Sequence, residues 1–207
     1  MNLIWVIPAK GDQKMNWLDP VGAGFSLICT YYFTTARRLA WLLGMIAIVL
    51  NVILYWQKGI YGSLVLEAVY FVSMIYGWYE WSHGATRQER PIRYLTAKEI
   101  FGLLPIALLG ITASIIALKA FTDSDVAYLD GTTTALSLLA QWLLCLKIIH
   151  CWILWFVVDA LMACLQLHKG LTFHSAIYWL YLILAVTGYF RWRKIYIMEN
   201  KNISYVT

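Results

Sequence analysis

The sequence predicts an all-α integral membrane protein with seven transmembrane helices arranged as a 3+1+3 parallel repeat. Hydrophobic residues make up 61% of its 207 residues and charged residues only 13%, which leaves too little polar surface to coat a water-soluble protein. The chain also contains seven apolar windows of about 20 residues, the length that spans a hydrocarbon layer of about 30 Å. Finally, residues 41–81 align without a gap with residues 152–192.

The apolar windows give the order of the predicted helices. They cover residues 18–35, 39–57, 61–82, 99–121, 131–147, 149–167 and 172–193. Residues 1–17 are expected to form an N-terminal surface segment, because their apolar stretch is too short to span a membrane and Lys10 lies on the wrong side of it for a signal peptide. The charged segment 83–98, which contains Pro91, is expected to be a cytoplasmic loop. Residues 194–207 are expected to form a cytoplasmic tail.

The repeat determines how the two halves are oriented. Identical residues 111 positions apart include Trp41 and Trp152, Tyr70 and Tyr181, Gly77 and Gly188, and Trp81 and Trp192. Residues 18–82 and 131–193 are therefore predicted to be three-helix repeats. Because three is odd, direct fusion would invert the second copy, and the linker helix at 99–121 restores its direction. Such a repeat in a membrane chain is typical of a transporter that binds its substrate between two halves.

The positive charges are distributed unevenly between the two sides of the predicted bundle. Five lie on one side, at Lys10, Lys14, Lys58, Lys119 and Lys169, and eleven on the other, at Arg37, Arg38, Arg87, Arg90, Arg93, Lys98, Lys147, Arg191, Arg193, Lys194 and Lys201. Since cytoplasmic loops carry the excess of Lys and Arg, the N-terminus is predicted to lie outside and the C-terminus inside. This bias accounts for the net charge of +5, and no basic patch indicates nucleic acid as a partner.

The main candidate binding residues lie on the helix predicted at 149–167. Trp152, Trp155 and Asp159 are spaced i, i+3 and i+7, so they share one face. A carboxylate within a span costs about 2.5 to 3.5 kcal/mol and normally faces a water-filled cavity or a partner. Two indole rings beside it would suit a flat or cationic ring. The alternative is that the tryptophans pack or anchor the helix and that Asp159 pairs with a neighbouring donor.

Other predicted helices supply further candidates for contacts with a substrate. Thr134 and Gln141 lie on one stripe of the helix at 131–147 and could hydrogen-bond a polyol, although small polar residues also pack between transmembrane helices. The first repeat supplies Asn51, Glu67 and Tyr70. Glu67 lies toward the outer end of its helix, so the alternative for it is a side chain that snorkels to the interface.

Patterns for catalysis or metal binding are absent from the sequence. The four histidines make no HExxH or other metal-ligand spacing, and no GxSxG sequence or glycine-rich phosphate loop is present. We therefore expect no enzymatic activity, no metal and no cofactor.

Four segments resemble the PnuC family of bacterial vitamin transporters. They are IYGWYEW at 75–81, DGTTTALSLLAQWLL at 130–144, WILW at 152–155 followed by VVDAL, and GYFRW at 188–192. The resemblance covers about residues 20–193. It implies uptake of nicotinamide riboside across the inner membrane by facilitated diffusion, with a cytoplasmic kinase that traps the product as nicotinamide mononucleotide for NAD biosynthesis. It also implies a homotrimer in the lipid membrane and a fold similar to the sugar-transporting SWEET proteins.

The resemblance also assigns residues to the binding site and leaves alternatives open. The family's WxxW motif falls on Trp152 and Trp155, and its polar fifth helix falls on Asp130, Thr134 and Gln141. This chain departs from the family pattern at Met74 and Glu67, where riboside transporters often have amides. Thiamine, or another vitamin of the same family such as a flavin, is therefore an alternative substrate. A membrane scaffold without a substrate, and a coupled transporter in which Asp159 and Glu67 titrate, are alternatives from other classes.

Overall fold

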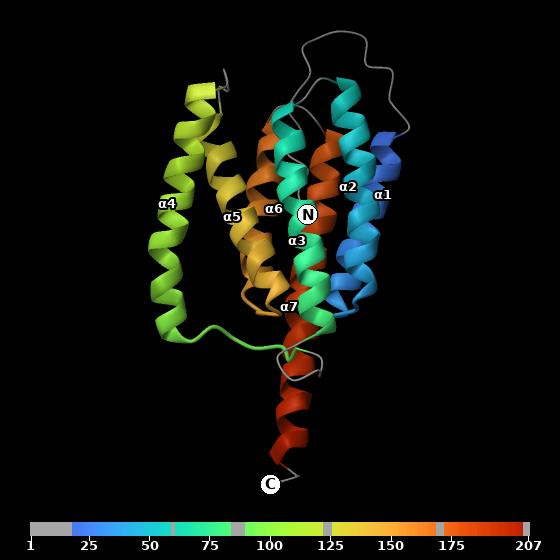
Figure 1. Cartoon of the computed structure of the whole chain (residues 1–207), viewed down its shortest axis with the longest axis vertical. Coiled ribbons are helices and arrows are strands. Elements are labelled where there is room, and N and C mark those ends of the chain that lie inside the picture. The colour runs from blue at the N-terminus through green and yellow to red at the C-terminus, as the bar shows by residue number, and fades with distance from the viewer. Residues whose placement is uncertain (1–17, 59–60, 84–89, 122–125, 169–171, 205–207) are drawn as a thin grey trace. The chain divides into compact units, whose positions relative to one another are not determined.

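The computed structural model is all-helical over the residues that it describes, which are 18–58, 61–83, 90–121, 126–168 and 172–204. These residues form seven helices and no strand (Figure 1). The helices are α1 (Leu18–Thr34), α2 (Leu39–Lys58), α3 (Tyr61–Ser82), α4 (Ala97–Phe121), α5 (Ala127–Cys145), α6 (Cys151–His168) and α7 (Thr172–Ser204). The predicted helices are all present, and residues 1–17 lie outside the described part of the chain.

The chain divides into two compact units, residues 1–90 and residues 91–207. In the first unit, α2 packs against both α1 and α3. In the second unit, α5 packs against α4 and α6, and α6 also packs against α7. The boundary falls inside the segment 83–98 that the sequence predicts as a loop, so α4 belongs to the second unit.

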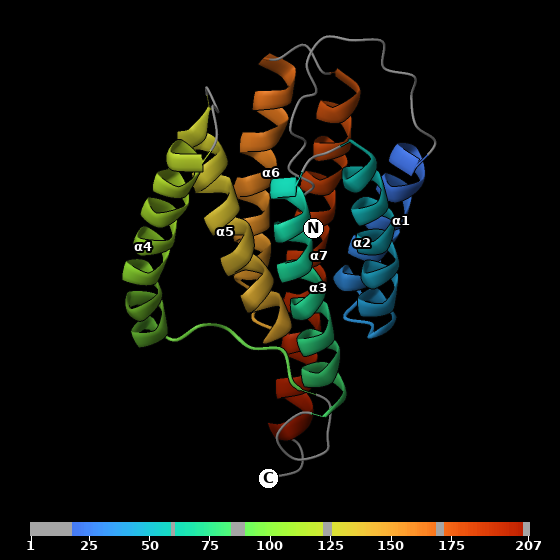
Figure 2. The ribbon, with the colours of Figure 1, turned by 45° about the horizontal axis from the view of Figure 1, so that its top comes forward.

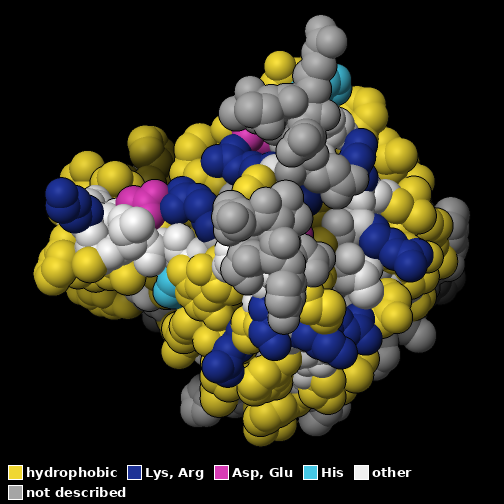
Figure 3. All heavy atoms as spheres, turned by 90° about the horizontal axis from the view of Figure 1, so that it is seen from below, with side chains coloured by type: hydrophobic (Ala, Val, Ile, Leu, Met, Phe, Trp, Pro, Cys, Tyr) yellow, Lys and Arg dark blue, Asp and Glu magenta, His cyan; other side chains and the backbone are white. Residues whose placement is uncertain are grey.

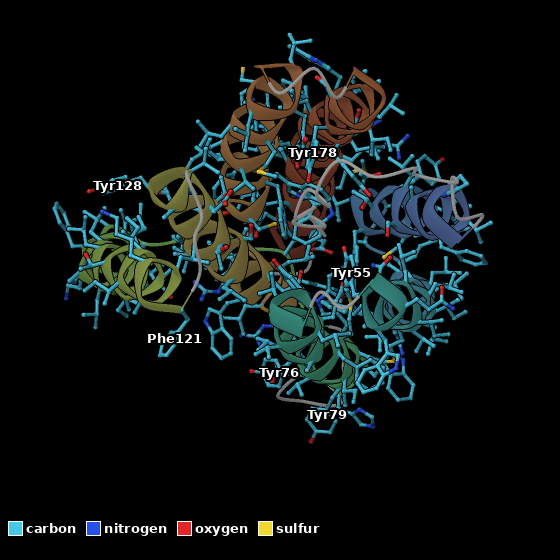
Figure 4. All side chains as sticks on the ribbon, turned by 90° about the horizontal axis from the view of Figure 1, so that it is seen from above. Tyr55, Tyr76, Tyr79, Phe121, Tyr128 and Tyr178 are labelled. Atoms are coloured by element: carbon cyan, nitrogen blue, oxygen red, sulfur yellow. The ribbon has the colours of Figure 1, made fainter. Side chains whose placement is uncertain are left out.

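The linker helix α4 has no buried residue. Phe101 and Leu109 are 73% and 72% exposed, and Figure 2 shows α4 beside α5 at the edge of the second unit. Near its C-terminal end, Lys119 places its Nζ 3.7 Å from the ring centroid of Tyr128 on α5. In Figure 4 Tyr128 and Phe121 point away from this unit. A helix so apolar on every side requires lipid around it.

Two of the described helices are long and apolar enough by themselves to cross a membrane. They are α2, over Leu39–Gln57 with a mean hydropathy of 2.2, and α4, with a mean hydropathy of 2.3. The apolar stretch of α6 is shorter, at Cys151–Leu167.

Two helix ends in the second unit differ from the sequence prediction, namely the start of α5 and the end of α7. α5 begins at Ala127 instead of residue 131, and α7 continues to Ser204 although its apolar window ends at residue 193. α7 has 33 residues, about 50 Å at 1.5 Å per residue, and it extends well past α5 and α6 (Figures 1 and 2). Hydropathy locates only the part of a helix that spans lipid. The backbone hydrogen bonds of a helix can continue beyond that part until a helix-breaking residue such as Gly or Pro. Residues 194–204 contain neither. The predicted tail is therefore helical as far as Ser204.

A tryptophan wedge joins α2 to α3 in the first unit. Trp41 is fully buried, and a Cβ on Gly77 would overlap its indole ring. The edges of Phe33 and Trp81 meet the same indole, with ring centroids 4.6 and 5.1 Å away. Glycine on α3 is therefore needed to let the indole of α2 approach its backbone.

The second unit has the same features 111 positions later. Trp152 of α6 lies against Gly188 of α7, where a Cβ would come within 2.5 Å of the indole, and Trp192 meets it edge-on at 5.5 Å. The turns before these wedges match as well. Ala36 and Lys147 are the non-glycine residues of the described chain with positive φ, at 54° and 52°. Local backbone geometry thus follows the sequence repeat.

A short segment before α4 lies along the α5–α6 turn of the second unit. The backbone N–H of Arg93 donates to the Lys147 carbonyl at 3.2 Å, and its carbonyl accepts from the N–H of Ile149 at 3.0 Å. The N–H of Leu95 donates to Nδ1 of His150 at 3.3 Å. We call residues 91–96 the strap, because these bonds fix the start of α4 to the turn.

The strap ends in a capping box that begins α4. The hydroxyl of Thr96 accepts from the backbone N–H of Glu99 at 3.3 Å, and the Glu99 carboxylate accepts from the N–H of Thr96 at 2.8 Å. The same carboxylate takes both arms of the Arg93 guanidinium at 2.8 and 2.9 Å. The predicted loop 83–98 is therefore ordered by specific bonds in its last part.

Candidate functional site

The predicted tryptophan and acid residues of α6 are buried on one face, as their spacing indicates. Trp152, Trp155 and Asp159 are 2%, 4% and 3% exposed, whereas Ile153 and Phe156 on the opposite face are 46% and 44% exposed. Asp159 has interaction partners within the structure. The arrangement places an indole ring four residues from a carboxylate inside the unit, where both are shielded from lipid.

The two tryptophans have different surroundings. Trp152 is occupied by its packing on Gly188 and Trp192, and its Nε1 has no hydrogen-bond partner among the described residues. Its repeat equivalent, Trp41, packs in the same way on Gly77. Trp155 corresponds instead to a glycine, Gly44, so its indole is particular to the second unit. The packing that the two units share therefore accounts for Trp152 but not for Trp155.

A shallow groove between α6 and α7 lies on the other side of Trp152. Its lining is almost entirely apolar and includes Ile153, Phe156, Val186 and Phe190. These four side chains are all more than 40% exposed. An open apolar groove of this kind suits lipid and lacks the polar groups that would orient a vitamin.

The candidates on α5 lie on the helix that packs against α6. Gln141 is 2% exposed, and Thr134 is half-buried. Ser137 between them donates its hydroxyl to the carbonyl of Thr133 at 2.6 Å, so it satisfies itself within the helix. Gln141 has interaction partners in the structure. The α5 stripe therefore contributes one buried amide, Gln141.

The first-unit candidates form a buried polar cluster. Asn51 on α2 donates from Nδ2 to Oε1 of Glu67 on α3 at 3.1 Å. Asn51, Glu67 and Tyr70 are 2%, 5% and 2% exposed. Glu67 therefore points into the unit, and the alternative of a snorkelling side chain is wrong. The backbone of α1 is close as well, because a Cβ on Gly22 would lie 3.0 Å from Oδ1 of Asn51.

The candidate residues thus fall into two clusters, one in each unit. Sequence reasoning missed Gln166, which is 2% exposed on α6 and whose Oε1 has no hydrogen-bond partner among the described residues. The signal was available, since Gln166 lies seven residues after Asp159 on the same stripe. No cluster of His, Cys, Asp and Glu that could hold a metal is found in the described ranges.

The chain is similar in sequence and in fold to known proteins. The sequence model of a family described as "Nicotinamide mononucleotide transporter" matches residues 16–194. The chain is 23% identical to the nicotinamide riboside transporter PnuC of Escherichia coli K12, covering 92% of this chain and 91% of that protein. It is 24% identical to the riboflavin/roseoflavin transporter RibM of Streptomyces davaonensis, covering 87% and 86%. The crystal structure of a vitamin B3 transporter PnuC superposes with a TM-score of 0.72 at 25% identity, over 88% of this chain and 83% of that chain.

Proposed function

The chain belongs to the nicotinamide mononucleotide transporter family, and from that membership we propose that it carries nicotinamide riboside across the bacterial inner membrane by facilitated diffusion. A membrane transporter of this family is not an enzyme. Support for the riboside comes from two relatives that bear its name and that match this chain over 91% and 80% of their own length. The observation that carries the proposal is the burial of Trp155 and Asp159 on one face of α6, because an indole ring and a carboxylate are suited to a flat cationic ring.

The roles of the site residues follow from their chemistry. Trp155 stacks on the pyridinium ring, and Trp152 holds the adjacent turn of α6 against α7 and closes the pocket behind it. Asp159 and Gln141 accept or donate hydrogen bonds to the ribose hydroxyls or the carboxamide, with Thr134 beside them. Asn51, Glu67 and Tyr70 of the first unit are further proposed contacts with the cargo.

The proposal includes the architecture through which transport occurs. The two three-helix repeats are parallel, as in SWEET-like folds, and α4 links them as the unmatched helix. The tryptophan wedges at positions 111 apart support this repeat. The protein forms a homotrimer, and a separate cytoplasmic kinase traps the imported riboside as its mononucleotide.

The orientation in the membrane is also proposed. The N-terminus lies outside and the C-terminus in the cytoplasm. The end from which α7 protrudes carries many Lys and Arg side chains (Figure 3), and the cytoplasmic side of membrane proteins carries the excess of such charges.

The experiment that tests the function is calorimetry of the purified protein with nicotinamide riboside, thiamine and riboflavin. We expect saturable binding of the riboside and a loss of roughly tenfold or more in affinity for Trp155→Ala, because stacking and cation–π attraction are removed. Trp179→Ala, at a side chain that is 53% exposed, is the matched control and should bind normally.

The other outcomes assign a different cargo or none. Binding of riboflavin alone would favour a flavin carrier, which the resemblance to RibM makes the second candidate. Binding of thiamine alone would keep the transporter and replace its substrate. If none of the three bound, the proposed function would be wrong.

A further inference from the structure

Glu67 is a carboxylate in the interior of the first unit for which the described residues provide no cationic partner. It lies on α3, is 5% exposed, and accepts one hydrogen bond, from Asn51. Its second oxygen, Oε2, is buried and has no hydrogen-bond partner among the described residues. Acids in membrane-spanning segments are costly and normally pair with a cation or serve a substrate pathway.

The described neighbours of Glu67 hold it in place without supplying a positive charge. Asn51 is neutral, and its Oδ1 lies against the backbone of α1 at Gly22, so its Nδ2 is directed toward α3. The other acid of α3, Glu80, has a different environment, because it is ion-paired with Arg90. Within one helix, therefore, one carboxylate is paired with a cation, and the other is buried with one oxygen that accepts no hydrogen bond from the described residues.

We propose that Glu67 makes the transporter selective for positive charge on its cargo. The carboxylate attracts the ring cation of the vitamin, and a neutral ring of the same shape is bound more weakly. This inference rests on the proposed function, because it assigns a specificity-determining residue to the same vitamin site. It predicts discrimination between a cationic ring and a neutral ring of nearly the same size.

The riboside and its 1,4-dihydro form are such a pair. They share the ribose and the carboxamide, whereas the oxidised pyridinium ring carries a full positive charge and the reduced ring carries none. The pyridinium nitrogen has no N–H to donate, so its attraction to Glu67 is Coulombic. Any hydrogen bond from the carboxamide to Oε2 would be available to both ligands. Stacking on Trp155 is the same in the wild type and in Glu67→Gln, so the change of the affinity ratio between these two proteins isolates the charge of Glu67.

The experiment measures both affinities for the wild type, Glu67→Gln and Glu80→Gln by calorimetry. Thiamine and its neutral thiophene analogue form a second pair of probes. For whichever pair binds, we expect the wild type to bind the cation roughly tenfold or more tightly than the neutral ring, as for a charge pair removed from water. Glu67→Gln keeps the shape and one hydrogen bond, so it should lower the ratio several-fold, to the preference that Trp155 and Asp159 supply, and Glu80→Gln should leave the ratio as in the wild type.

The outcomes separate this inference from the function on which it rests. Equal binding of cation and neutral ring by the wild type, a preference for neutral riboflavin, or an unchanged ratio in Glu67→Gln would overturn the charge selectivity and leave transport intact. If the wild type bound none of the five ligands (the riboside, its dihydro form, thiamine, its thiophene analogue and riboflavin), the proposed function would be overturned as well. The wild-type ratio needs no variant, so the inference is testable even if Glu67→Gln fails to fold.

Discussion

Trp152 illustrates how one residue can have a structural and a functional role. Its spacing with Trp155 and Asp159 predicts a ligand contact, and all three side chains are buried on one face of α6. Its packing on Gly188, however, is repeated by Trp41 on Gly77 in the first unit, where the acid is replaced by Ile48. A Trp152 variant could therefore lose binding either because a ligand contact is removed or because α6 no longer packs on α7. Trp155 is the better probe of the site.

The wedges give a prediction about stability. Gly77→Ala and Gly188→Ala should each destabilise the protein by about 1 to 3 kcal/mol, because the added methyl group must displace a buried indole. Thermal unfolding in detergent measures the effect as a lower apparent Tm. Gly24→Ala and Gly102→Ala are matched controls in the two units, since a Cβ there meets nothing within 4 Å. They should be neutral or slightly stabilising, since alanine favours helix. An unchanged Tm for Gly188→Ala would contradict the wedge.

The strap shows how a segment between two helices can depend on one histidine. Nδ1 of His150 accepts the N–H of Leu95, which it can do as a neutral ring with its proton on Nε2. The edge of Tyr94 also meets this imidazole, with centroids 5.6 Å apart. Burial lowers the pKa of His150 from its ordinary value of 6.5, because a partly desolvated imidazole resists protonation.

This histidine makes the strap sensitive to pH. Its pKa is lower when the strap is bound than when it is released, so the contact is present above about pH 6.5 and weakens as the pH falls below that value. Hydrogen exchange of the peptide at 91–96 should therefore show less protection at pH 5.5 than at pH 7.5, after correction for intrinsic rates. His150→Asn, whose amide oxygen accepts at either pH, is the control and should show no such change. Equal protection of the wild type at both values would refute the idea.

The sequence predicts where the helices lie better than it predicts where they end or which side chains bond between them. A span must be apolar over about 20 residues to lie in lipid, so α2 and α3 could be located within a residue or two. The extension of α7 to Ser204 carries no hydropathy signal. The hydrogen bond between Asn51 and Glu67 joins two neighbouring helices, through residues that are 16 positions apart in the sequence. Such a tertiary contact is not encoded in the periodicity of either helix.

For the whole molecule, a cationic cargo changes how the transport mechanism must be tested. A facilitator brings its substrate to electrochemical equilibrium, and moving one charge through 100 mV is worth about 2.3 kcal/mol. A potential of about 60 mV, negative inside, would therefore concentrate a monovalent cation about tenfold without any coupling to protons. Accumulation by itself would not show that Asp159 or Glu67 carries a proton.

We therefore predict the result of uptake into proteoliposomes with the two driving forces separated. With the membrane potential clamped at zero by potassium and valinomycin, a pH gradient should cause no accumulation of labelled nicotinamide riboside beyond equal concentrations. With the pH equal on both sides, a negative interior of about 60 mV should give about tenfold accumulation. Empty liposomes provide the background. If the pH gradient alone drove accumulation at zero potential, proton movement would be coupled to the cargo, and facilitated diffusion would be the wrong mechanism.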